Sequence, residues 1–313
     1  MSTSPDITRV RADVAEILGD GGSEGIAPDD NLLDVGIDSV RLMMLTQRWQ
    51  DDGIDVDFAS LVEEPTLARW EELFAAAPRR ARAAGGSSLS TLSVVRVEQL
   101  TPRVVRITLG GKGIEAFDGA APGAHALLRV PGGAAPRPVT VRYHGGSAEI
   151  DLDVVTHERG PLGRWASAVR PPETVTVSRP VTPPAPDAGA DWTLHVTDQT
   201  GFAAVAHRLE RLPADARAVV VAVVADAAEE QLFPAVAALD VRWVHAAPGT
   251  GAELAVAAAR AALPDSGVGA VRVTGEAELV RAVTAAVGDS VGQCTAEPYW
   301  QRSVDAEELF RAS

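Results

Sequence analysis

The stretch Asp34–Leu45, "DVGIDSVRLMML", changes from a polar loop to a strongly apolar segment, and Ser39 stands at the change. Apolar residues then recur at the spacing of a helix, so the pattern predicts a helix that begins at this serine. A phosphate ester on the Ser39 hydroxyl would lie at a helix N-terminus, where N–H groups and the helix dipole favour negative charge. The pair Asp38-Ser39 also suits a plain N-cap, so these letters alone allow a modification site or a capping residue.

The first 78 residues have the pattern of an acidic helical module. Apolar residues recur at helical spacing in Ile7–Leu18, Val40–Trp49 and Leu67–Phe74, which predicts a small helical bundle. Residues 1–78 hold 17 Asp and Glu against 5 Arg, a net charge of −12, whereas the whole 313-residue chain carries −15. A surface of this charge repels nucleic acid and anionic lipid, so we expect neither nucleic acid nor a membrane as a partner.

A linker and a change of period follow this module. Residues 79–89 are rich in small residues and have no apolar period, which predicts a flexible linker. In residues 90–182 the apolar residues take the period of strands. The strand-like segments are Val94–Leu109, Ala126–Val130, Val139–Tyr143, Ile150–His157 and Thr174–Val177. Short strands separated by Gly and Pro, without long helices, predict an antiparallel β-barrel.

Residues 183–313 alternate strand-like and helix-like segments. The strand-like strings are "WTLHV", "RAVVVAVVA", "VRWVHA" and "AVRVTG". The helix-like segments that follow them are Phe202–Leu212, Gln231–Leu239, Ala252–Leu263 and Ala277–Val287, in that order. This alternation predicts a doubly wound α/β domain with a parallel sheet. The chain is therefore expected to be multidomain, with boundaries at 1–78, 79–89, 90–182 and 183–313.

Composition and motif searches exclude several other classes. The single cysteine, Cys294, excludes a disulfide framework and any multi-cysteine metal site, and the six histidines show no metal-ligand spacing, so no metal is expected. No G-x-S-x-G elbow is present to support serine hydrolysis. The longest aliphatic run is too short to cross a bilayer and no signal-peptide pattern opens the chain, so we expect a cytoplasmic protein.

A family resemblance extends the reading of Ser39. The segment Asn31–Leu73, with its Gly36-x-Asp38-Ser39 motif and the string "EEPTL" before the last helix, resembles the carrier domains of nonribosomal peptide synthesis. It is most similar to aryl carrier domains of catechol-siderophore pathways, which are four-helix bundles. The resemblance implies that a phosphopantetheinyl transferase attaches 4′-phosphopantetheine to Ser39. An adenylating enzyme would then load an aryl or aminoacyl group, and downstream synthetase domains would receive it.

The same resemblance assigns the residues around the attachment site. Asp38, Val40, Met43 and Met44 would form the contact surface for partner enzymes, because methionine adapts to several partners. Plain core packing explains each of these apolar residues equally well. A carrier domain has no catalytic role of its own, since the reactive group is the thiol of the arm.

The second half of the chain carries a different set of motifs. The strings "APGAHALLRVP" (121–131), "RPVTVR" (137–142), "DWTLHVTDQTGFAAVAHRLERLP" (191–213), "TGEAE" (274–278) and "PYWQRS" (298–303) follow in order. Together they resemble the siderophore-interacting protein family, which are FAD-dependent ferric-siderophore reductases. The resemblance implies a ferredoxin-reductase-like pair, in which the barrel holds FAD and the parallel sheet offers a site for NAD(P)H.

The flavin motifs are kept in part. The family's Arg-x-Tyr-Ser/Thr motif reads Arg137-Pro138-Val139-Thr140, so the phosphate-binding arginine and the hydroxyl are present but the stacking tyrosine is a valine. Loss of the aromatic face removes about 1 kcal/mol of stacking. The resemblance also assigns the next motif to FAD, at His157, Gly160, Pro161, Gly163 and Trp165. Its glycine turn leads into a helix N-terminus that suits a pyrophosphate.

The nicotinamide motifs depart further from the family. The family's string Gly-Asp-Glu-Thr-Ala-Leu-Pro-Ala reads Thr197-Asp-Gln-Thr-Gly-Phe-Ala-Ala204 here, which keeps Asp198 and Thr200. Gly275 and Glu276 are kept, but Val273 and Thr274 replace the tryptophan and alanine before them. Tyr299 and Trp300 persist without the basic residue and glycine expected after them, so the sequence gives poor support for NAD(P)H.

A third function, ferric-siderophore reduction by an enzyme that only accompanies a carrier, leaves the fusion unexplained, and two functions fit these observations better. In the first, a group tethered to Ser39 is oxidised or reduced by a flavin in the barrel, and fusion raises its local concentration. In the second, the reductase-like domain has lost its cofactor, and cyclises, gates or docks the tethered intermediate.

Overall fold

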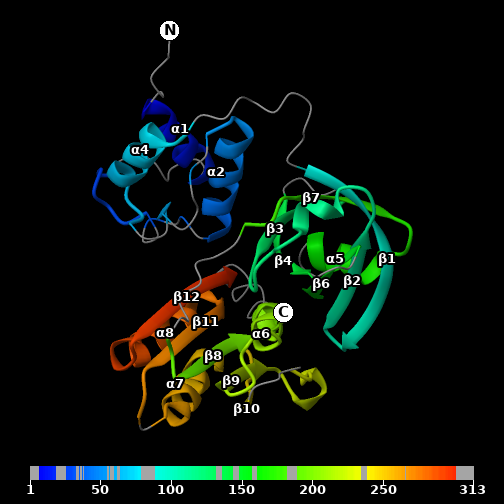
Figure 1. Ribbon diagram of the computed structural model, residues 1–313, viewed down its shortest axis with the longest axis vertical. Helices are drawn as coiled ribbons and strands as arrows, with labels where there is room; N and C mark the ends of the chain where they lie inside the picture. Colours follow the sequence, from blue (N-terminus) through cyan, green and yellow to red (C-terminus); the bar gives the residue numbers. More distant parts are fainter. Residues whose placement is uncertain are drawn as a thin grey trace, which may run out of the picture. The chain divides into compact units, whose positions relative to one another are not determined.

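The computed structural model describes residues 7–18, 26–32, 35, 37, 39–54, 56, 60–61, 64–78, 89–131, 136–143, 148–156, 161–181, 189–233, 238–264 and 266–300. The chain forms two compact units, Met1–Ser90 and Thr91–Ser313. Figure 1 shows their elements coloured along the sequence. Among the described residues, no helix is long and apolar enough to cross a membrane.

The first unit is helical. Its helices α1 (Ile7–Leu18), α2 (Ser39–Asp51) and α4 (Leu67–Ala76) lie where helical spacing predicted them. Ser60 and Leu61 are also helical, but their neighbours 57–59 and 62–63 lie outside the described residues, so the fourth helix of the bundle remains a prediction.

Three aromatic side chains lie in the core of this unit. The ring of Trp49 meets Trp70 edge to face at 6.4 Å and Phe74 at 5.2 Å, and all three side chains are fully buried. Asp13 of α1 is also buried, and its carboxylate accepts a 2.7 Å hydrogen bond from Trp49 Nε1 and a 3.2 Å bond from Arg48. The partners satisfy a carboxylate that burial would otherwise penalise.

The second unit opens with a seven-stranded antiparallel barrel. Its elements are β1 (Leu89–Thr101), β2 (Val104–Gly110), η1 (Ile114–Phe117), β3 (His125–Arg129), β4 (Arg137–Thr140), β5 (Arg142–Tyr143), β6 (Glu149–Val155), α5 (Pro161–Ala168) and β7 (Thr174–Ser178). The strand order is β4-β3-β7-β1-β2-β6-β5. Only Val141 separates β4 from β5, although these strands end the order on opposite sides, so the sheet curls back on itself. The predicted run Val94–Leu109 is two strands, because Pro102 and Arg103 turn β1 into β2.

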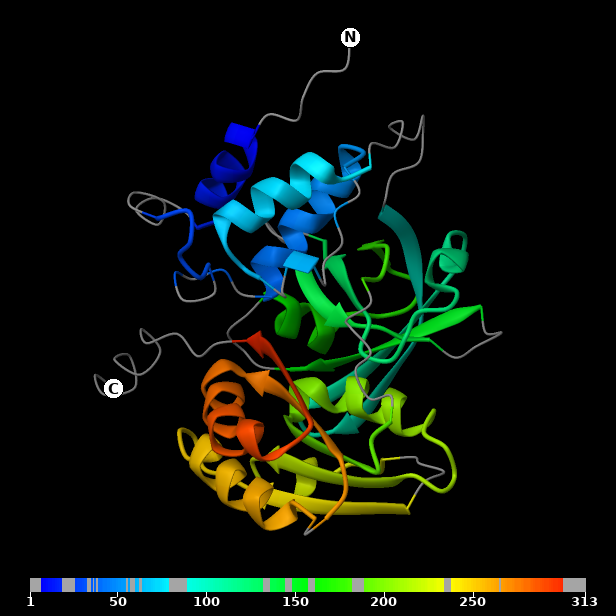
Figure 2. The same cartoon turned by 60° about the vertical axis from the view of Figure 1, so that its left-hand side comes forward.

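A five-stranded parallel sheet completes this unit. Its elements are β8 (Trp192–Asp198), η2 (Gln199–Gly201), α6 (Phe202–Leu209), β9 (Arg217–Val224), η3 (Ala227–Glu229), β10 (Ala238–His245), α7 (Gly251–Ala262), β11 (Gly269–Glu276), α8 (Ala277–Val287), η4 (Gly288–Ser290) and β12 (Gln293–Trp300). The order β10-β9-β8-β11-β12 reverses direction at β8. Figure 2 shows α7 and α8 on one face of the sheet and α6 on the other.

One predicted helix is wrong. The segment Gln231–Leu239 was expected to be helical, but Gln231–Phe233 has no regular structure, and Ala238 and Leu239 begin β10. Ala238 pairs with Arg217 of β9, so sheet pairing overrides the helical propensity of this alanine-rich segment. Phe233 packs instead against the rings of Phe202 and Trp243, which also contact each other. The predicted helix Phe202–Leu212 likewise ends at Leu209.

Candidate functional site

Ser39, the predicted attachment residue, lies where the sequence predicted a helix start. Ser39 is the first residue of α2, although its side chain and those of Val40 and Met43 lie outside the described part of the structure, as does all of Asp38. Met44 is partly buried, whereas Leu42 and Leu45 on the same helix are fully buried. The leucines therefore form the inner side of α2, and Met44 lies at its margin.

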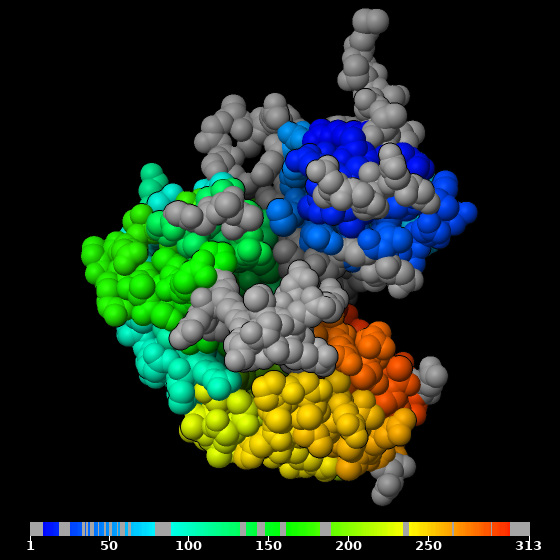
Figure 3. Space-filling view, turned by 180° about the vertical axis from the view of Figure 1, so that it is seen from behind, coloured from blue at the N-terminus to red at the C-terminus, as the bar shows by residue number. Residues whose placement is uncertain are grey.

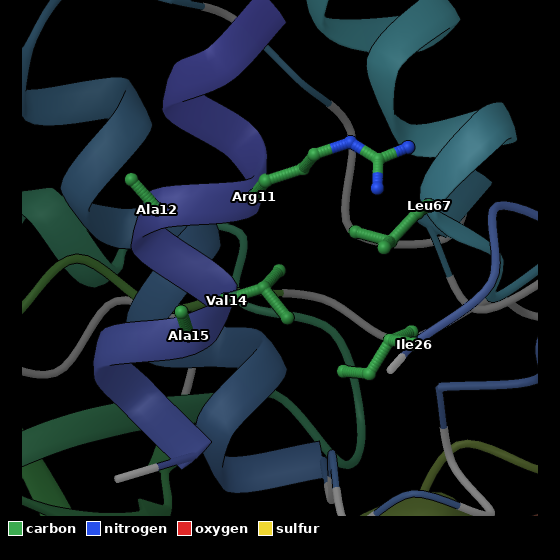
Figure 4. A pocket seen from close by; sticks show the side chains of 6 residues that line it. All are labelled: Arg11, Ala12, Val14, Ala15, Ile26 and Leu67. Carbon is green, nitrogen blue, oxygen red and sulfur yellow. The ribbon is translucent and has the colours of Figure 1, made fainter. Parts of the chain in front are cut away.

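A pocket in the first unit is lined by none of the predicted carrier residues. It has a volume of about 300 Å³ and is lined by Arg11, Ala12, Val14, Ala15, Ile26 and Leu67. Figure 4 shows Arg11 of α1 extending toward α4, where its Nε donates a 2.7 Å hydrogen bond to Glu71. Arg11 therefore forms an ion pair that joins α1 to α4.

The predicted flavin residues of the barrel divide into two groups. Arg137 is exposed on β4, and its guanidinium makes no hydrogen bond or ion pair with the residues that the structure describes. Val139 is 7% exposed and belongs to the barrel core, while Thr140 is buried beside it. The strand therefore offers a cation and a hydroxyl without an aromatic platform.

The second flavin motif is described only from Pro161 onward, because His157 and Gly160 lie outside the described residues. Pro161 begins α5, and Gly163 is buried on that helix. Trp165 packs against the barrel core, and its Nε1 is buried without a hydrogen-bond partner within the described ranges. A lone buried N–H is uncommon, and here it lies on the helix whose N-terminus suits a pyrophosphate.

These observations test the fit of FAD to the barrel. An unpaired arginine, a hydroxyl and a helix N-terminus are the donors that a flavin nucleotide needs for its phosphates and ring edge. Because Val139 has no aromatic ring, only the stacking contact with the flavin ring is missing. The residues present therefore fit the polar half of FAD.

The predicted nicotinamide residues meet at the carboxyl ends of β8, β11 and β12. The Asp198 carboxylate accepts hydrogen bonds from Thr200 N at 2.8 Å, Thr200 Oγ1 at 2.5 Å, Glu276 N at 2.8 Å and Trp300 Nε1 at 2.9 Å. Burial, the largest effect, raises the pKa of Asp198, while these donors oppose the rise. Gly275 has φ 123°, and a Cβ there would lie 2.7 Å from the Asp198 carboxylate, which explains the glycine.

This place is the topological switch point of the sheet, since the strand order reverses between β8 and β11. Ligands of doubly wound folds bind outside such switch points. Trp300 is 41% exposed, so its indole remains accessible while its N–H holds Asp198. The sequence therefore identified a cluster that the fold assembles from residues about a hundred positions apart.

Three departures from the family string are packed against one another. Thr197 and Thr274 are buried on neighbouring strands, and Thr274 Oγ1 donates a 2.9 Å hydrogen bond to Thr197 Oγ1. A Cβ on Gly201 would collide with both hydroxyls. Two threonines thus fill the volume that the family's alanine at position 201 would need. The residues at positions 197, 201 and 274 therefore compensate one another in volume.

The seam between barrel and sheet holds charged and aromatic residues, of which the sequence analysis named only Tyr299 as a candidate site residue. His125 of β3 lies 3.4 Å from Thr140, measured from Nε2 to Oγ1, and its ring meets Tyr299 of β12 edge to face at 4.7 Å. Tyr299 Oη donates to Glu297 at 3.4 Å, and Glu297 faces Arg208 at 3.9 Å and Arg272 at 3.6 Å.

A second contact at the seam depends on Glu229, which is 1% exposed. Its carboxylate accepts a 2.6 Å hydrogen bond from Thr101 of the barrel and a 2.7 Å bond from Gln199 of the sheet. Arg142 of β5 also pairs with Glu210 after α6. No spacing in the sequence brings such distant positions together, so only the fold could reveal them.

The described residues contain no group of three or more His, Cys, Asp or Glu side chains arranged to hold a metal ion.

Comparisons with known proteins match the two units separately. Residues 8–74 match the model of the phosphopantetheine attachment site, and residues 190–303 match that of the siderophore-interacting protein family. Phenyloxazoline synthase MbtB of Mycobacterium tuberculosis is 42% identical over 85 residues, which are 26% of this chain and 6% of the synthase. The chain therefore spans a small fraction of that relative's length.

The relatives that match the second unit cover a larger share of this chain than the synthase does. An uncharacterised protein of M. tuberculosis is 31% identical over 187 residues, or 51% of this chain and 66% of that protein. The crystal structure of a siderophore utilization protein from T. fusca has a TM-score of 0.62 and 29% identity, covering 70% of this chain and 95% of that one.

SipS, a siderophore-interacting protein from Aeromonas hydrophila, gives a TM-score of 0.58 at 26% identity and covers 68% of this chain and 98% of its own. Ferredoxin-NADP+ reductase from Plasmodium falciparum shares the fold at 8% identity, with a TM-score of 0.55. The match covers 67% of this chain and 96% of the reductase. The chain is thus a fusion of a carrier domain of the phosphopantetheine attachment type with a ferredoxin-reductase-like domain of the siderophore-interacting protein family.

Proposed function

We propose that the chain is a phosphopantetheine-dependent aryl or aminoacyl carrier of nonribosomal peptide or siderophore-type synthesis, fused to a flavin oxidoreductase that acts on the tethered intermediate. The carrier function rests on Ser39 at the start of α2 and on the likeness to the phenyloxazoline synthase. The partners are a phosphopantetheinyl transferase, an adenylating enzyme and downstream synthetase domains.

The oxidoreductase function is supported above all by Arg137. Its exposed guanidinium has no partner among the described residues, although arginines on folded surfaces commonly pair with carboxylates. An exposed arginine that begins the strand on which the buried Thr140 hydroxyl ends gives this strand a cation that can bind an anion. The phosphate of a flavin nucleotide is an anion of the right chemistry.

The chain's own residues would have separate duties in this reaction. Arg137 would hold phosphate, the N-terminus of α5 would face the pyrophosphate, and Thr140 would hydrogen-bond the ring edge. When bound, FAD would supply two-electron transfer to or from the tethered group. Fusion to the carrier raises the local concentration of that group to roughly the millimolar range.

A second candidate is favoured by Val139. Because this residue packs into the barrel core, the site lacks the aromatic face that would stack on a flavin. A domain without cofactor would instead cyclise, gate or dock the tethered intermediate.

The experiment that separates the two candidates is a visible absorption spectrum of the pantetheinylated protein, followed by titration with FAD. Mass spectrometry of Ser39→Ala beside the wild type checks the attachment. The proposal expects a flavin band that dithionite bleaches, and an FAD affinity about tenfold weaker in Arg137→Met, since a charged hydrogen bond contributes about 1.5–3 kcal/mol. Ser39→Ala is the matched control, because it removes the arm but leaves FAD binding unchanged. Absence of binding at micromolar FAD would leave the cofactor-free function.

A further inference from the structure

One imidazole contacts both the barrel site and the end of the parallel sheet. His125 begins β3, directly opposite Thr140 of β4 in the antiparallel register. Its Nε2 lies 3.4 Å from the Thr140 hydroxyl, and its ring lies edge to face against Tyr299, with an angle of 77° between the planes. His125 therefore links the flavin motif of the barrel to the terminal motif of β12.

The hydrogen-bond partners of His125 indicate where its proton lies. A hydrogen bond to the backbone of Gly123 raises the pKa of His125, as donation from a ring N–H to a carbonyl oxygen does. Since Nε2 faces the Thr140 hydroxyl, Nδ1 is the ring nitrogen left to donate to this backbone, and the Nδ1–H tautomer is the premise of the proposal below. Burial, the largest effect, lowers the pKa, so the ring is neutral at neutral pH.

The charged groups around His125 shift its pKa in opposite directions. Glu297 of β12 raises the pKa of His125, and Arg208 of α6 lowers it. Tyr299 faces the ring as a neutral phenol, because burial raises its pKa well above the ordinary value. Desolvation therefore decides the charge of the imidazole near pH 7.

We propose that His125 is a positioning residue that sets the direction in which the Thr140 hydroxyl donates its hydrogen bond. With a neutral ring, Nε2 accepts the Thr140 hydrogen, and the hydroxyl oxygen presents lone pairs to the ligand. With a protonated ring, Nε2–H donates to Thr140, and the hydroxyl hydrogen turns toward the ligand. No bond to carbon and no electron transfer is involved; only one proton is taken up by the ring.

This inference rests on the proposed function, in which the ligand beside Thr140 is the edge of an oxidised flavin. Such an edge carries a ring nitrogen that accepts hydrogen bonds, and reduction converts that nitrogen to a donor. A neutral His125 therefore favours the reduced form of the ligand, and a protonated His125 favours the oxidised form. The histidine would thus match the hydroxyl of Thr140 to the redox state of the bound ring.

The test is a set of FAD titrations between about pH 5 and 8 with the wild type, His125→Phe, Thr140→Val and the double variant. Phenylalanine keeps a ring against Tyr299 but removes Nε2, and valine keeps the shape of threonine without the hydroxyl. We expect the affinity of the wild type for oxidised FAD to rise as the pH falls below the ordinary pKa of histidine toward the lowered pKa of His125, by up to about fivefold, the equivalent of one hydrogen bond of about 1 kcal/mol. This pH dependence should vanish in both single variants, and the double variant should match them.

Arg137→Met serves as the control, because loss of a phosphate contact should weaken FAD binding equally at every pH. Retention of the wild-type pH dependence in His125→Phe, or additive losses in the double variant, would overturn the proposal. Urea unfolding of each variant confirms that the domain is folded before its affinity is compared.

An imidazole ¹⁵N NMR spectrum of the protein without FAD separates this inference from the proposed function. The Nδ1–H tautomer of His125, with an Nε2 shift that changes in Thr140→Val, supports the orientation argued here even if FAD fails to bind. The Nε2–H tautomer would refute it, whatever the FAD titrations show.

Discussion

The exchange at positions 197, 201 and 274 predicts a stability pattern that packing alone explains. In Gly201→Ala, the new Cβ meets the hydroxyls of Thr197 and Thr274 and lies 3.2 Å from Thr274 Cβ. Gly201 has φ −94° and ψ −3°, which alanine adopts without strain, so the whole effect is steric. Neither threonine can swing into solvent, because Thr197 is 0% exposed and Thr274 is 4% exposed.

The magnitude follows from what the added methyl group displaces. Overpacking of a filled core costs about 1–3 kcal/mol. Separation of the two hydroxyls also removes the 2.9 Å hydrogen bond between them, with a net loss of about 1 kcal/mol. We therefore expect Gly201→Ala to lower the free energy of unfolding by about 3 kcal/mol, or Tm by roughly 6–12 °C for a unit of this size.

The matched variant restores the family's residues at all three positions, as Thr197→Gly, Gly201→Ala and Thr274→Ala together. Removal of both threonine side chains opens the volume that the alanine needs, so the triple variant should recover most of the loss. The assay is urea denaturation followed by circular dichroism, with the transition of the carrier unit as internal reference. The reasoning fails if Gly201→Ala costs less than about 1 kcal/mol, or if the triple variant is no more stable than the single one.

Two further predictions concern buried carboxylates. Asp13→Asn should lower the free energy of unfolding of the carrier unit by about 2 kcal/mol, because the carboxylate accepts from Trp49 and Arg48; urea denaturation should show an unchanged transition for the second unit, and an equal loss in both units would contradict the assignment. For Asp198, whose pKa is raised by burial, the folded state binds more protons than the unfolded state between the ordinary and the raised pKa, so stability should fall as pH rises through that window. Asp198→Asn should abolish this slope in unfolding curves recorded against pH, and an identical slope in both proteins would show that another group is responsible.

Sequence patterns predicted the elements whose packing agrees with their local propensity. Helix α8 begins and ends where the apolar spacing placed it, at Ala277 and Val287. The helix predicted for Gln231–Leu239 failed because Ala238 and Leu239 lead into Val241, Trp243 and Val244, which suit a strand that pairs with β9, and pairing is a property of the fold. Two strands of the barrel were merged because Pro102 and Arg103 turn the chain within two residues.

The candidate sites likewise divide into residues that a local motif indicates and residues that only the fold brings together. Ser39 and Asp198 could be proposed from the sequence, because each belongs to a short motif, at a helix start and at a strand end respectively. The position of Val139 in the barrel core could not be read from the string alone, because strand alternation does not say which face is inward. His125 and Glu229 were missed since their partners lie far along the chain; His125 stands out only once β3 and β4 are paired.

The buried carboxylate of Glu229 limits how this protein can be recombined. A chimera that replaced the barrel alone would bury Glu229 without Thr101, leaving a charged group with half of its hydrogen bonds. Barrel and parallel sheet are therefore best exchanged together as one cassette that begins with β1. The carrier unit has a hydrophobic core of its own, so different carriers can be joined to the same cassette without disturbing its interior.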